Sequence, residues 1–461
     1  MKKPCLAKES HDSYRWYLDA AERGDAYAQF NLALLYKNGA GVVRDEGQAF
    51  RWMGLSASQG LVFAQNHLGA MYYAGRGVAP DDEQAVHWFR LAARQGDASA
   101  QQNLGLMYRR GRGVAQSDEV AAVWFARAAE QGLASAQALI GQAYARGRGV
   151  KRNEALALAW LRKAALQNDV GGQLHLGMMY KQGRGVARND AQALAWFRLA
   201  AERGDAVAQR LVGLAYAEGQ GVGADAGRAY AWLNRAAEQE DADAQFNLGV
   251  MLANGKGVPR DEELAFTWYR RAAGAGHALA QFNLGGMYAR GRGVARDDVA
   301  ALDWYRMAAE QGAPHAQFNV AVMYANGHGV AKDEAQAAVW YRNAALQGDA
   351  SAQNNLGVMY ANGLGVAQDD AQAVDWYGKA AEQGHALAQY NLGGMYGSGR
   401  GVKRDEVLSY MWLTLAAQAG DMAAISNRRK MALAMSPQTL LAAQEMVRAW
   451  RAAHQAAPAG R

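Results

Sequence analysis

The sequence has little cysteine and little proline. Its 461 residues include one cysteine, Cys5, and six prolines. A single cysteine excludes an internal disulfide, so the fold does not depend on an oxidising compartment. Few prolines leave long stretches that can form uninterrupted helices. No run of about 18 apolar residues is present, so we expect no membrane-spanning segment.

An excess of one charge is also lacking. The 49 basic and 43 acidic groups give a formal charge of +6, and charges of both signs alternate along the chain. Proteins that bind nucleic acids usually concentrate basic charge on one face, so we do not expect a nucleic acid as partner. Residues 1–9 include lysines but no apolar core of the length that export needs. We expect a cytoplasmic protein, and a periplasmic or secreted location stays open for a chain whose signal peptide has been removed.

Residue groups typical of enzymes are missing as well. Turns such as Gly291-Arg292-Gly293 lack the preceding strand and the third glycine of a dinucleotide site. Histidines such as His67 and His175 lie in non-adjacent parts of the sequence, and no His, Cys or Glu cluster has metal-ligand spacing. No pair of side chains in the sequence can be assigned as a catalytic nucleophile and its general base. The sequence therefore predicts no enzyme, no cofactor and no metal.

What the sequence does contain is a 36-residue repeat without a single insertion. A glutamine marks each copy: Gln29, Gln65, Gln101, Gln137, Gln173, Gln209, Gln245, Gln281, Gln317, Gln353 and Gln389. A tryptophan follows in the same register: Trp52, Trp88, Trp124, Trp160, Trp196, Trp232, Trp268, Trp304, Trp340, Trp376 and Trp412. One register over eleven copies indicates a single supersecondary unit stacked on itself.

Each repeat is predicted to form two antiparallel helices, A and B, of about 13 residues. Leu284, Met287 and Tyr288 form an apolar stripe at i, i+3 and i+4 of helix A. Helix A ends at Gly291, because a left-handed residue there favours glycine. A side-chain oxygen is predicted to cap helix B in every repeat. These residues are Asp45, Asp81, Ser117, Asn153, Asn189, Asp225, Asp261, Asp297, Asp333, Asp369 and Asp405.

The ends of the chain depart from the repeat and are expected to cover its terminal faces. We expect disordered residues 1–10, a capping helix in 11–24, eleven repeats in 25–420, capping helices in 421–452 and a disordered tail in 453–461. Ser436 and Pro437 mark the start of the last helix, as cap and first-turn proline. Glu240 replaces a glycine between repeats and predicts an altered turn.

The shared pattern is A-x-A-Q-x-N-L-G-x-M-Y-x-x-G-x-G-V-x-x-D, followed by A-x-x-W-Y-x-x-A-A-x-x-G. It resembles the Sel-one-like repeat, a relative of the tetratricopeptide repeat, over about residues 10–420. The resemblance implies an all-α fold: an α-solenoid, a right-handed superhelix of about eleven repeats with degenerate capping helices. It also implies a scaffold or adaptor that binds protein partners on the concave surface of its A helices. A cysteine-rich branch of the family binds β-lactams. This chain has only Cys5, so hydrolysis of a cell-wall or β-lactam compound is a disfavoured alternative.

The residue before Leu-Gly in helix A is asparagine in most repeats. In similar tetratricopeptide superhelices an asparagine ladder at this place binds an extended peptide, since an amide offers both a donor and an acceptor. Leu139, His175 and Leu211 interrupt the column, so we place the predicted peptide site in the second half of the chain. The ladder residues there are Asn247, Asn283, Asn319, Asn355 and Asn391. Beside them lie Phe246, Phe282, Phe318 and Tyr390, and further along the same face lie Asn254, Arg290, Asn326 and Asn362.

Two alternatives to this peptide site stay open. In the first, the asparagines only join neighbouring helices and the aromatic residues only fill the core. In the second, basic residues on the loops form a ridge that binds an acidic partner or polyanion. One column of this ridge lies inside the Gly-x-Gly turns: Arg76, Arg112, Arg148, Arg184, Lys256, Arg292 and Arg400. The other lies just after them: Arg44, Arg152, Arg188, Arg260, Arg296, Lys332 and Arg404. The same ridge is also explained as a solvated edge close to the Asp caps.

Overall fold

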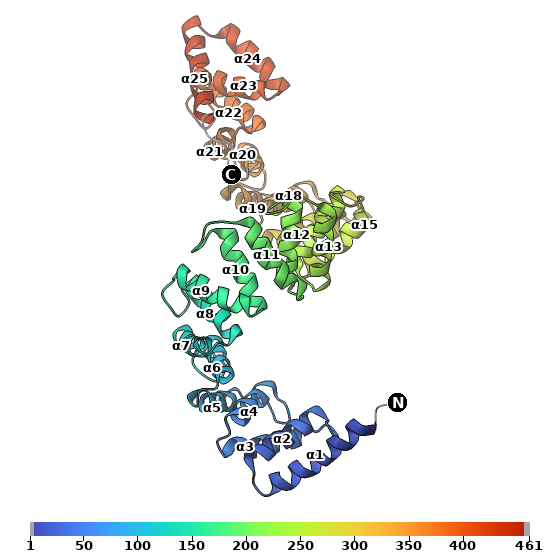
Figure 1. Cartoon of the computed structure of the whole chain (residues 1–461). Coiled ribbons are helices and arrows are strands. Elements are labelled where there is room, and N and C mark those ends of the chain that lie inside the picture. The colour runs from blue at the N-terminus through green and yellow to red at the C-terminus, as the bar shows by residue number, and fades with distance from the viewer. Residues whose placement is uncertain (1–3, 456–461) are drawn as a thin grey trace. The chain divides into compact units, whose positions relative to one another are not determined.

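A computed structural model of the chain describes residues 4–455, which form 25 helices and no strand within that range (Figure 1). The predicted all-α solenoid is confirmed. The chain forms two units, Met1–Ala236 (unit 1) and Ala237–Arg461 (unit 2). Within each unit, helix pairs follow one another in chain order.

Every repeat contains two helices of 13 residues, as predicted. The A helices are α2 (Ala26–Asn38), α4 (Val62–Ala74), α6 (Ala98–Arg110), α8 (Ala134–Arg146), α10 (Val170–Gln182), α12 (Ala206–Glu218), α14 (Ala242–Asn254), α16 (Ala278–Arg290), α18 (Pro314–Asn326), α20 (Ala350–Asn362) and α22 (Ala386–Ser398). The B helices are α3 (Glu46–Ser58), α5 (Asp82–Arg94), α7 (Asp118–Glu130), α9 (Glu154–Leu166), α11 (Asp190–Glu202), α13 (Ala226–Glu238), α15 (Glu262–Gly274), α17 (Asp298–Glu310), α19 (Glu334–Leu346), α21 (Asp370–Glu382) and α23 (Glu406–Gln418).

The predicted helix ends are confirmed. Gly291 follows α16 with a φ of 65°, in the left-handed region that favours glycine. Asp297 caps α17, because its Oδ1 accepts a hydrogen bond of 2.9 Å from the amide of Ala300. Each of the eleven predicted caps accepts such a bond three residues on. These local signals define where helices A and B begin and end.

The second glycine of each Gly-x-Gly turn has a separate role between repeats. A Cβ atom on Gly293 would lie 2.2 Å from the carbonyl oxygen of Glu262, on the first turn of the preceding B helix. The loop can therefore rest directly on that helix only if the residue is glycine. Arg292, between the two glycines, reaches the Glu262 carboxylate at 2.8 Å.

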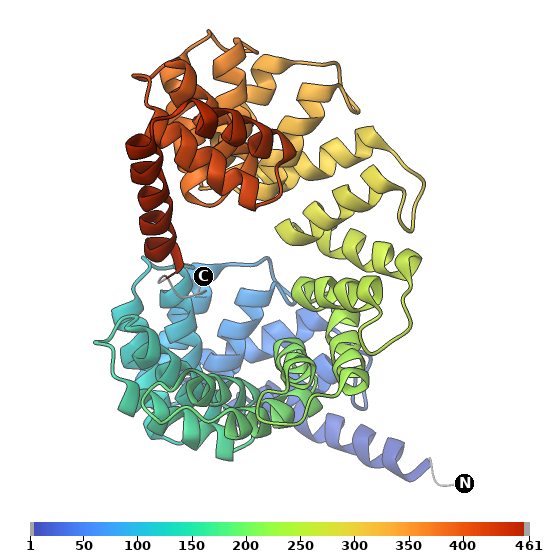
Figure 2. The ribbon, with the colours of Figure 1, turned by 90° about the horizontal axis from the view of Figure 1, so that it is seen from above.

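Most helices pack on both sequence neighbours within their unit. In unit 2, α15 contacts α14 of its own repeat and α16 of the next, and the same holds for α17, α19 and α21 (Figure 2). The interior contains small residues where helices approach, such as Ala308 and Ala309, which are at most 1% exposed. Larger side chains such as Leu284 fill the remaining space and are also buried.

A buried glutamine joins three helices in most repeats. The Gln281 amide donates to the carbonyl of Ala273, at the end of the preceding B helix, at 3.1 Å. Its Oε1 accepts a bond of 2.7 Å from Gln311, which caps the B helix of the same repeat. The same glutamine pairs are Gln59–Gln29, Gln95–Gln65, Gln131–Gln101, Gln167–Gln137, Gln347–Gln317 and Gln383–Gln353.

Helices outside the repeats cover the ends. Helix α1 (Pro4–Glu22) begins earlier than the predicted residue 11, and α25 (Pro437–Gln455) continues past the predicted end at 452. The rest of the two segments predicted to be disordered, residues 1–3 and 456–461, lies outside the described residues.

Helix α24 (Met422–Ala434) takes the place of a further A helix. The predicted start of α25 is correct, because the Ser436 hydroxyl accepts a hydrogen bond of 3.2 Å from the amide of Thr439. Helix α25 packs on α23, and Val447 lies in the shared core (Figure 2).

The turn at Glu240 keeps its left-handed conformation instead of forming a different turn. Glu240 has a φ of 66° and Asn168, at the equivalent place in another repeat, has a φ of 65°. Glycines at this place, such as Gly204 and Gly276, have φ values of 93° and 89°. Two residues that carry a Cβ atom therefore adopt the left-handed conformation that elsewhere is left to glycine.

We expect Glu240→Gly to raise the free energy of unfolding by about 1 kcal/mol, because it removes the cost of a left-handed Cβ-bearing residue. Asn168→Gly is the matched control and should give a smaller gain, since asparagine tolerates this region better. Urea unfolding followed by circular dichroism measures both. A loss of stability in Glu240→Gly would show that the strain is absent.

Three repeats lack the second glutamine, with Arg203, Ala275 or Ala419 in its place, and Gln173 belongs to the first of them. Its Oε1 is buried and has no hydrogen-bond partner among the described residues, because Arg203 stands where other repeats have the second glutamine. We expect Arg203→Gln to supply the missing donor and stabilise the protein by about 1 kcal/mol. Arg203→Ala removes the same arginine without adding a donor. Equal melting temperatures for these two variants would contradict the explanation.

Candidate functional site

A pocket recurs at the junctions between successive A helices. Its walls come from the last turn of one A helix and the middle of the next, and its floor comes from the B helix between them. In unit 1 it is seen at α2/α4, α4/α6 and α6/α8, with volumes of about 280, 190 and 30 Å³. In unit 2 it is seen at α14/α16 and α18/α20, with volumes of about 310 and 240 Å³. We call these the junction pockets.

The floor residue of most junction pockets packs against a glycine inside helix A, and Ala33 and Ala321 take its place opposite Met53 and Tyr341. Tyr269 is 4% exposed, and a Cβ atom on Gly249 would lie 2.6 Å from its ring. The floor residues of unit 1 are apolar: Met53, Phe89, Phe125, Leu161, Phe197 and Leu233. Four consecutive floor residues of unit 2 are tyrosines: Tyr269, Tyr305, Tyr341 and Tyr377.

The tyrosine hydroxyls of unit 2 lie beside the predicted asparagines. Burial raises the pKa of Tyr269 to about 12, while a hydrogen bond from Asn283 and the charge of Arg292 act to lower it. Burial likewise raises the pKa of Tyr305 and Tyr341, against the hydrogen bonds from Asn319 and Asn355. A neutral hydroxyl and an amide therefore stand together at three consecutive junctions of unit 2.

The largest junction pocket brings together four of the residues predicted for peptide binding. Asn254, Phe282, Asn283 and Arg290 all line the α14/α16 pocket, and Asn355 lines the α18/α20 pocket. The ladder residues of unit 2 are half-buried, whereas Asn254, Arg290, Asn326 and Asn362 are exposed. Sequence reasoning missed the floor tyrosines. The signal was present, because Trp is followed by Tyr in these repeats and by Phe or Leu in most others.

Other ladder residues hold the helices together. The Asn391 amide donates to Asn354 of the preceding repeat at 3.1 Å. The Asn247 amide donates to the carbonyl of Asp243 in its own helix at 2.7 Å. Farther along the face, Asn254 and Asn362 also bond their own helix backbone, at 2.9 Å each. The column thus combines asparagines that brace helices with asparagines that face the junction pockets.

The predicted aromatic residues mainly contribute to packing. Phe246, Phe282 and Phe318 lie with ring centroids 5.9, 5.7 and 5.7 Å from the floor tyrosine of the same repeat. Phe246 also stacks on His277, whose Nδ1 caps α16 by accepting from Ala280. The Tyr390 hydroxyl accepts a hydrogen bond of 3.3 Å from Asn427.

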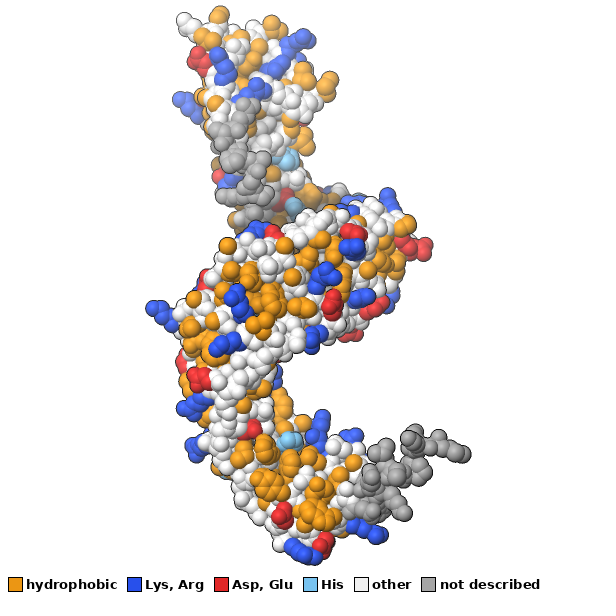
Figure 3. Space-filling model, viewed as in Figure 1, with side chains coloured by type: hydrophobic (Ala, Val, Ile, Leu, Met, Phe, Trp, Pro, Cys, Tyr) orange, Lys and Arg blue, Asp and Glu red, His pale blue; other side chains and the backbone are white. Residues whose placement is uncertain are grey.

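The loop ridge is matched by carboxylates in most repeats. Arginines inside the Gly-x-Gly turns pair with the first residue of the preceding B helix: Arg112–Asp82, Arg148–Asp118, Arg184–Glu154, Arg292–Glu262 and Arg400–Asp370. The second column pairs two residues on: Arg44–Glu46, Arg152–Glu154, Arg188–Asp190, Arg260–Glu262, Arg296–Asp298, Lys332–Glu334 and Arg404–Glu406. The visible face shows both signs of charge intermixed (Figure 3).

The described residues contain neither a metal-binding cluster nor a membrane-spanning helix. Between residues 4 and 455, no group of three or more His, Cys, Asp or Glu side chains could hold a metal ion. No helix in that part of the chain combines the length and the apolar character needed to cross a bilayer.

The stacked helix pairs and the recurring junction pockets define an α-solenoid of helix-turn-helix repeats. The chain belongs to the Sel1 repeat family, which matches it in eleven segments. These are residues 26–61, 62–97, 98–133, 134–169, 171–205, 206–241, 242–277, 278–312, 314–349, 350–385 and 386–421. None of the curated proteins matches the chain.

Two solved structures are similar over much of the chain. The c5321 protective antigen of uropathogenic Escherichia coli, which has an SLR fold, is 36% identical, with a TM-score of 0.77. The match covers 97% of this chain and 98% of that one. A Sel1 repeat protein from Oxalobacter formigenes is 35% identical, with a TM-score of 0.53, and the match covers 68% of this chain and 93% of that one.

We expect Gly357→Ala to destabilise the protein by roughly 1–3 kcal/mol, because the added Cβ would lie 2.7 Å from the ring of Tyr377. Gly394→Ala is the control. It lies inside α22 with no heavy atom within 4 Å of the added Cβ, and should stabilise the protein by up to about 1 kcal/mol through helix propensity. Thermal unfolding measures both. Equal effects of the two changes would show that the ring does not need the glycine.

Proposed function

We propose that this protein is a non-enzymatic scaffold or adaptor, and that unit 2 binds an extended segment of a protein partner along its A helices. Stacked repeats present long rows of equivalent side chains to other molecules. The same chemical group repeated along a row suits recognition of a polymer better than a reaction at one centre. This reasoning favours a binding protein over a hydrolase.

The observation that carries the proposal is the pairing of a tyrosine row with an asparagine row in unit 2. Tyr269, Tyr305 and Tyr341 each stand beside the asparagine of the next repeat. A hydroxyl and an amide each offer a donor and an acceptor. An extended peptide also repeats one donor and one acceptor per residue, so such a row can bind a backbone whatever its side chains.

We propose different contacts with the partner for different residues of unit 2. Asn283, Asn319 and Asn355 face the floor tyrosines and are proposed to bind the partner's backbone. Asn247 and Asn391 already hold helix contacts through their amide nitrogens, so their oxygens are the atoms proposed to accept from a partner. The exposed residues further along the face, including Arg290, are proposed to contact the partner's side chains.

The loop ridge is a weaker candidate for the main binding surface. Most of its arginines and lysines are matched by carboxylates two or thirty residues away. A partner would have to replace these ion pairs, and exposed pairs exchanged in this way give little net free energy. We therefore place the protein-binding surface of unit 2 on the A helices.

The proposal is tested with the double variant Asn319→Ala/Asn355→Ala. We expect partner capture to fall roughly 10- to 100-fold, because two hydrogen bonds to the partner are lost at about 1 kcal/mol each. The matched control is Asn31→Ala/Asn103→Ala, in the same column of unit 1. Affinity capture with quantitative mass spectrometry measures retention, and circular dichroism confirms that the melting temperature changes little. Unchanged capture by the unit 2 variant would remove this site.

A further inference from the structure

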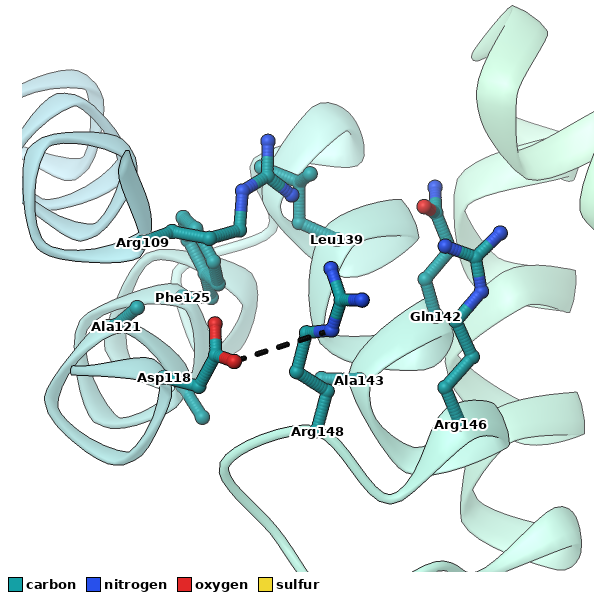
Figure 4. Close-up of a pocket in the computed structure, with 10 residues that line it drawn as sticks. Arg109, Asp118, Ala121, Phe125, Leu139, Gln142, Ala143, Arg146 and Arg148 are labelled. Carbon is teal, nitrogen blue, oxygen red and sulfur yellow. Dashed lines mark ion pairs between the residues drawn. The ribbon is translucent and has the colours of Figure 1, made fainter. Parts of the chain in front are cut away.

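One junction of unit 1 brings three arginines together beside a single carboxylate. Arg109 and Arg146, from the ends of α6 and α8, line the α6/α8 junction pocket together with Arg148 from the following loop. Asp118 is the one carboxylate that lines it, and it lies 3.8 Å from Arg148. Figure 4 shows the three guanidinium groups extending to the same side of the hollow.

Arg109 and Arg146 have no ion-pair partner among the described residues. Arg109 is half-buried and its guanidinium lies over the ring of Phe125, 5.6 Å from the centroid. Burial lowers the pKa of Arg109, and the charges of Arg110, Arg148 and Arg146 lower it further. The fold thus holds three like charges at this junction beside one acid, Asp118.

The same junction differs from those of unit 2 in its other walls. Leu139 occupies the place of the ladder asparagine, and the floor is Phe125 rather than tyrosine. The ladder amide is therefore missing here, and Gln142 is the side-chain amide that lines the hollow. The hollow itself has a volume of about 30 Å³, which admits little more than a water-sized group. A ligand must be held at the rim, by the guanidinium groups.

We propose that the Arg109, Arg146 and Arg148 cluster is a binding site for the carboxylate side chains of an acidic polypeptide segment. A guanidinium presents a planar pair of donors that matches a carboxylate in two parallel hydrogen bonds. Bound carboxylates would neutralise charges that now repel each other. The site lies wholly in unit 1 and does not depend on the asparagine row of unit 2.

The charge distribution favours a peptide over a nucleic acid. A phosphate backbone is held by many basic groups spread along its path. The neighbouring arginines on the loops are already paired, for example Arg112 with Asp82 and Arg184 with Glu154. The three arginines of this junction share one carboxylate, Asp118, and such a compact excess of charge suits one or two acidic side chains.

The test uses the full-length protein and two fluorescent peptides of equal length, one alternating Glu with Gly and the other Gln with Gly. We expect the Glu peptide to bind more tightly in fluorescence anisotropy. The double variant Arg109→Gln/Arg146→Gln should weaken its binding by about tenfold or more, with a smaller effect at high salt. Its melting temperature should not fall, because the substitutions remove repulsion.

The matched control is Arg152→Gln/Arg188→Gln, which removes the same charge from the same unit at arginines that pair with Glu154 and Asp190. It should retain binding of the Glu peptide. Equal losses in the two double variants, or equal affinity for the two peptides, would overturn the proposal. Tighter binding of a single-stranded oligonucleotide that is lost in the Arg109→Gln/Arg146→Gln variant would assign the cluster to phosphates and also overturn the proposal.

The variant Asn319→Ala/Asn355→Ala should still bind the Glu peptide, so this proposal and the unit 2 site can fail separately.

Discussion

The buried glutamine of helix A is the contact that fixes the register of the stack. Gln281 joins the end of one B helix, its own A helix and the cap of the next B helix at one point removed from water. An unpaired amide at such a point costs about 1–3 kcal/mol, so a repeat cannot slide against its neighbour without a large loss. The second glycine of the loop, as at Gly293, adds a steric condition at the other end of the same interface. Equivalent residues of successive repeats therefore line up within each unit.

Because the repeats stack in one register, the junction pockets are built from equivalent positions. They differ in the side chains that occupy those positions. The floor side chain always comes from the same place in helix B, and in most repeats a glycine in helix A leaves room for its ring or branched chain. A change from Phe125 to Tyr269 at equivalent places keeps the packing and adds a hydroxyl. A change from Asn283 to Leu139 removes an amide from the wall in the same way. The chemistry of a junction can thus vary by one or two side chains while the helix stack is conserved.

Local features of the fold could be predicted from the sequence, and contacts between repeats mostly could not. Asp297 and Gly291 were predicted as helix ends because capping and left-handed turns depend on a few adjacent residues. The roles of Gln281, of Gly293 and of the Arg292–Glu262 pair depend on residues about 30 positions apart, which become neighbours only after stacking. The tyrosine row was missed for the same reason. Tyr269 lies on the B helix and reaches the A-helix face only between two repeats.

The two candidate binding surfaces, the tyrosine and asparagine rows of unit 2 and the arginine cluster of unit 1, would recognise a partner in different ways. In unit 2 the hydroxyl and amide groups recur from Tyr269 to Asn355, so a bound segment would gain a small contribution at each junction and tolerate the loss of one. In unit 1 the charges of Arg109, Arg146 and Arg148 are concentrated at one junction beside one carboxylate, so affinity would depend on few residues and fall steeply with salt. A row of neutral groups selects for an extended backbone, whereas a charge cluster selects for particular side chains. One repeated scaffold can therefore support both kinds of recognition, because its register is held by contacts that neither surface uses.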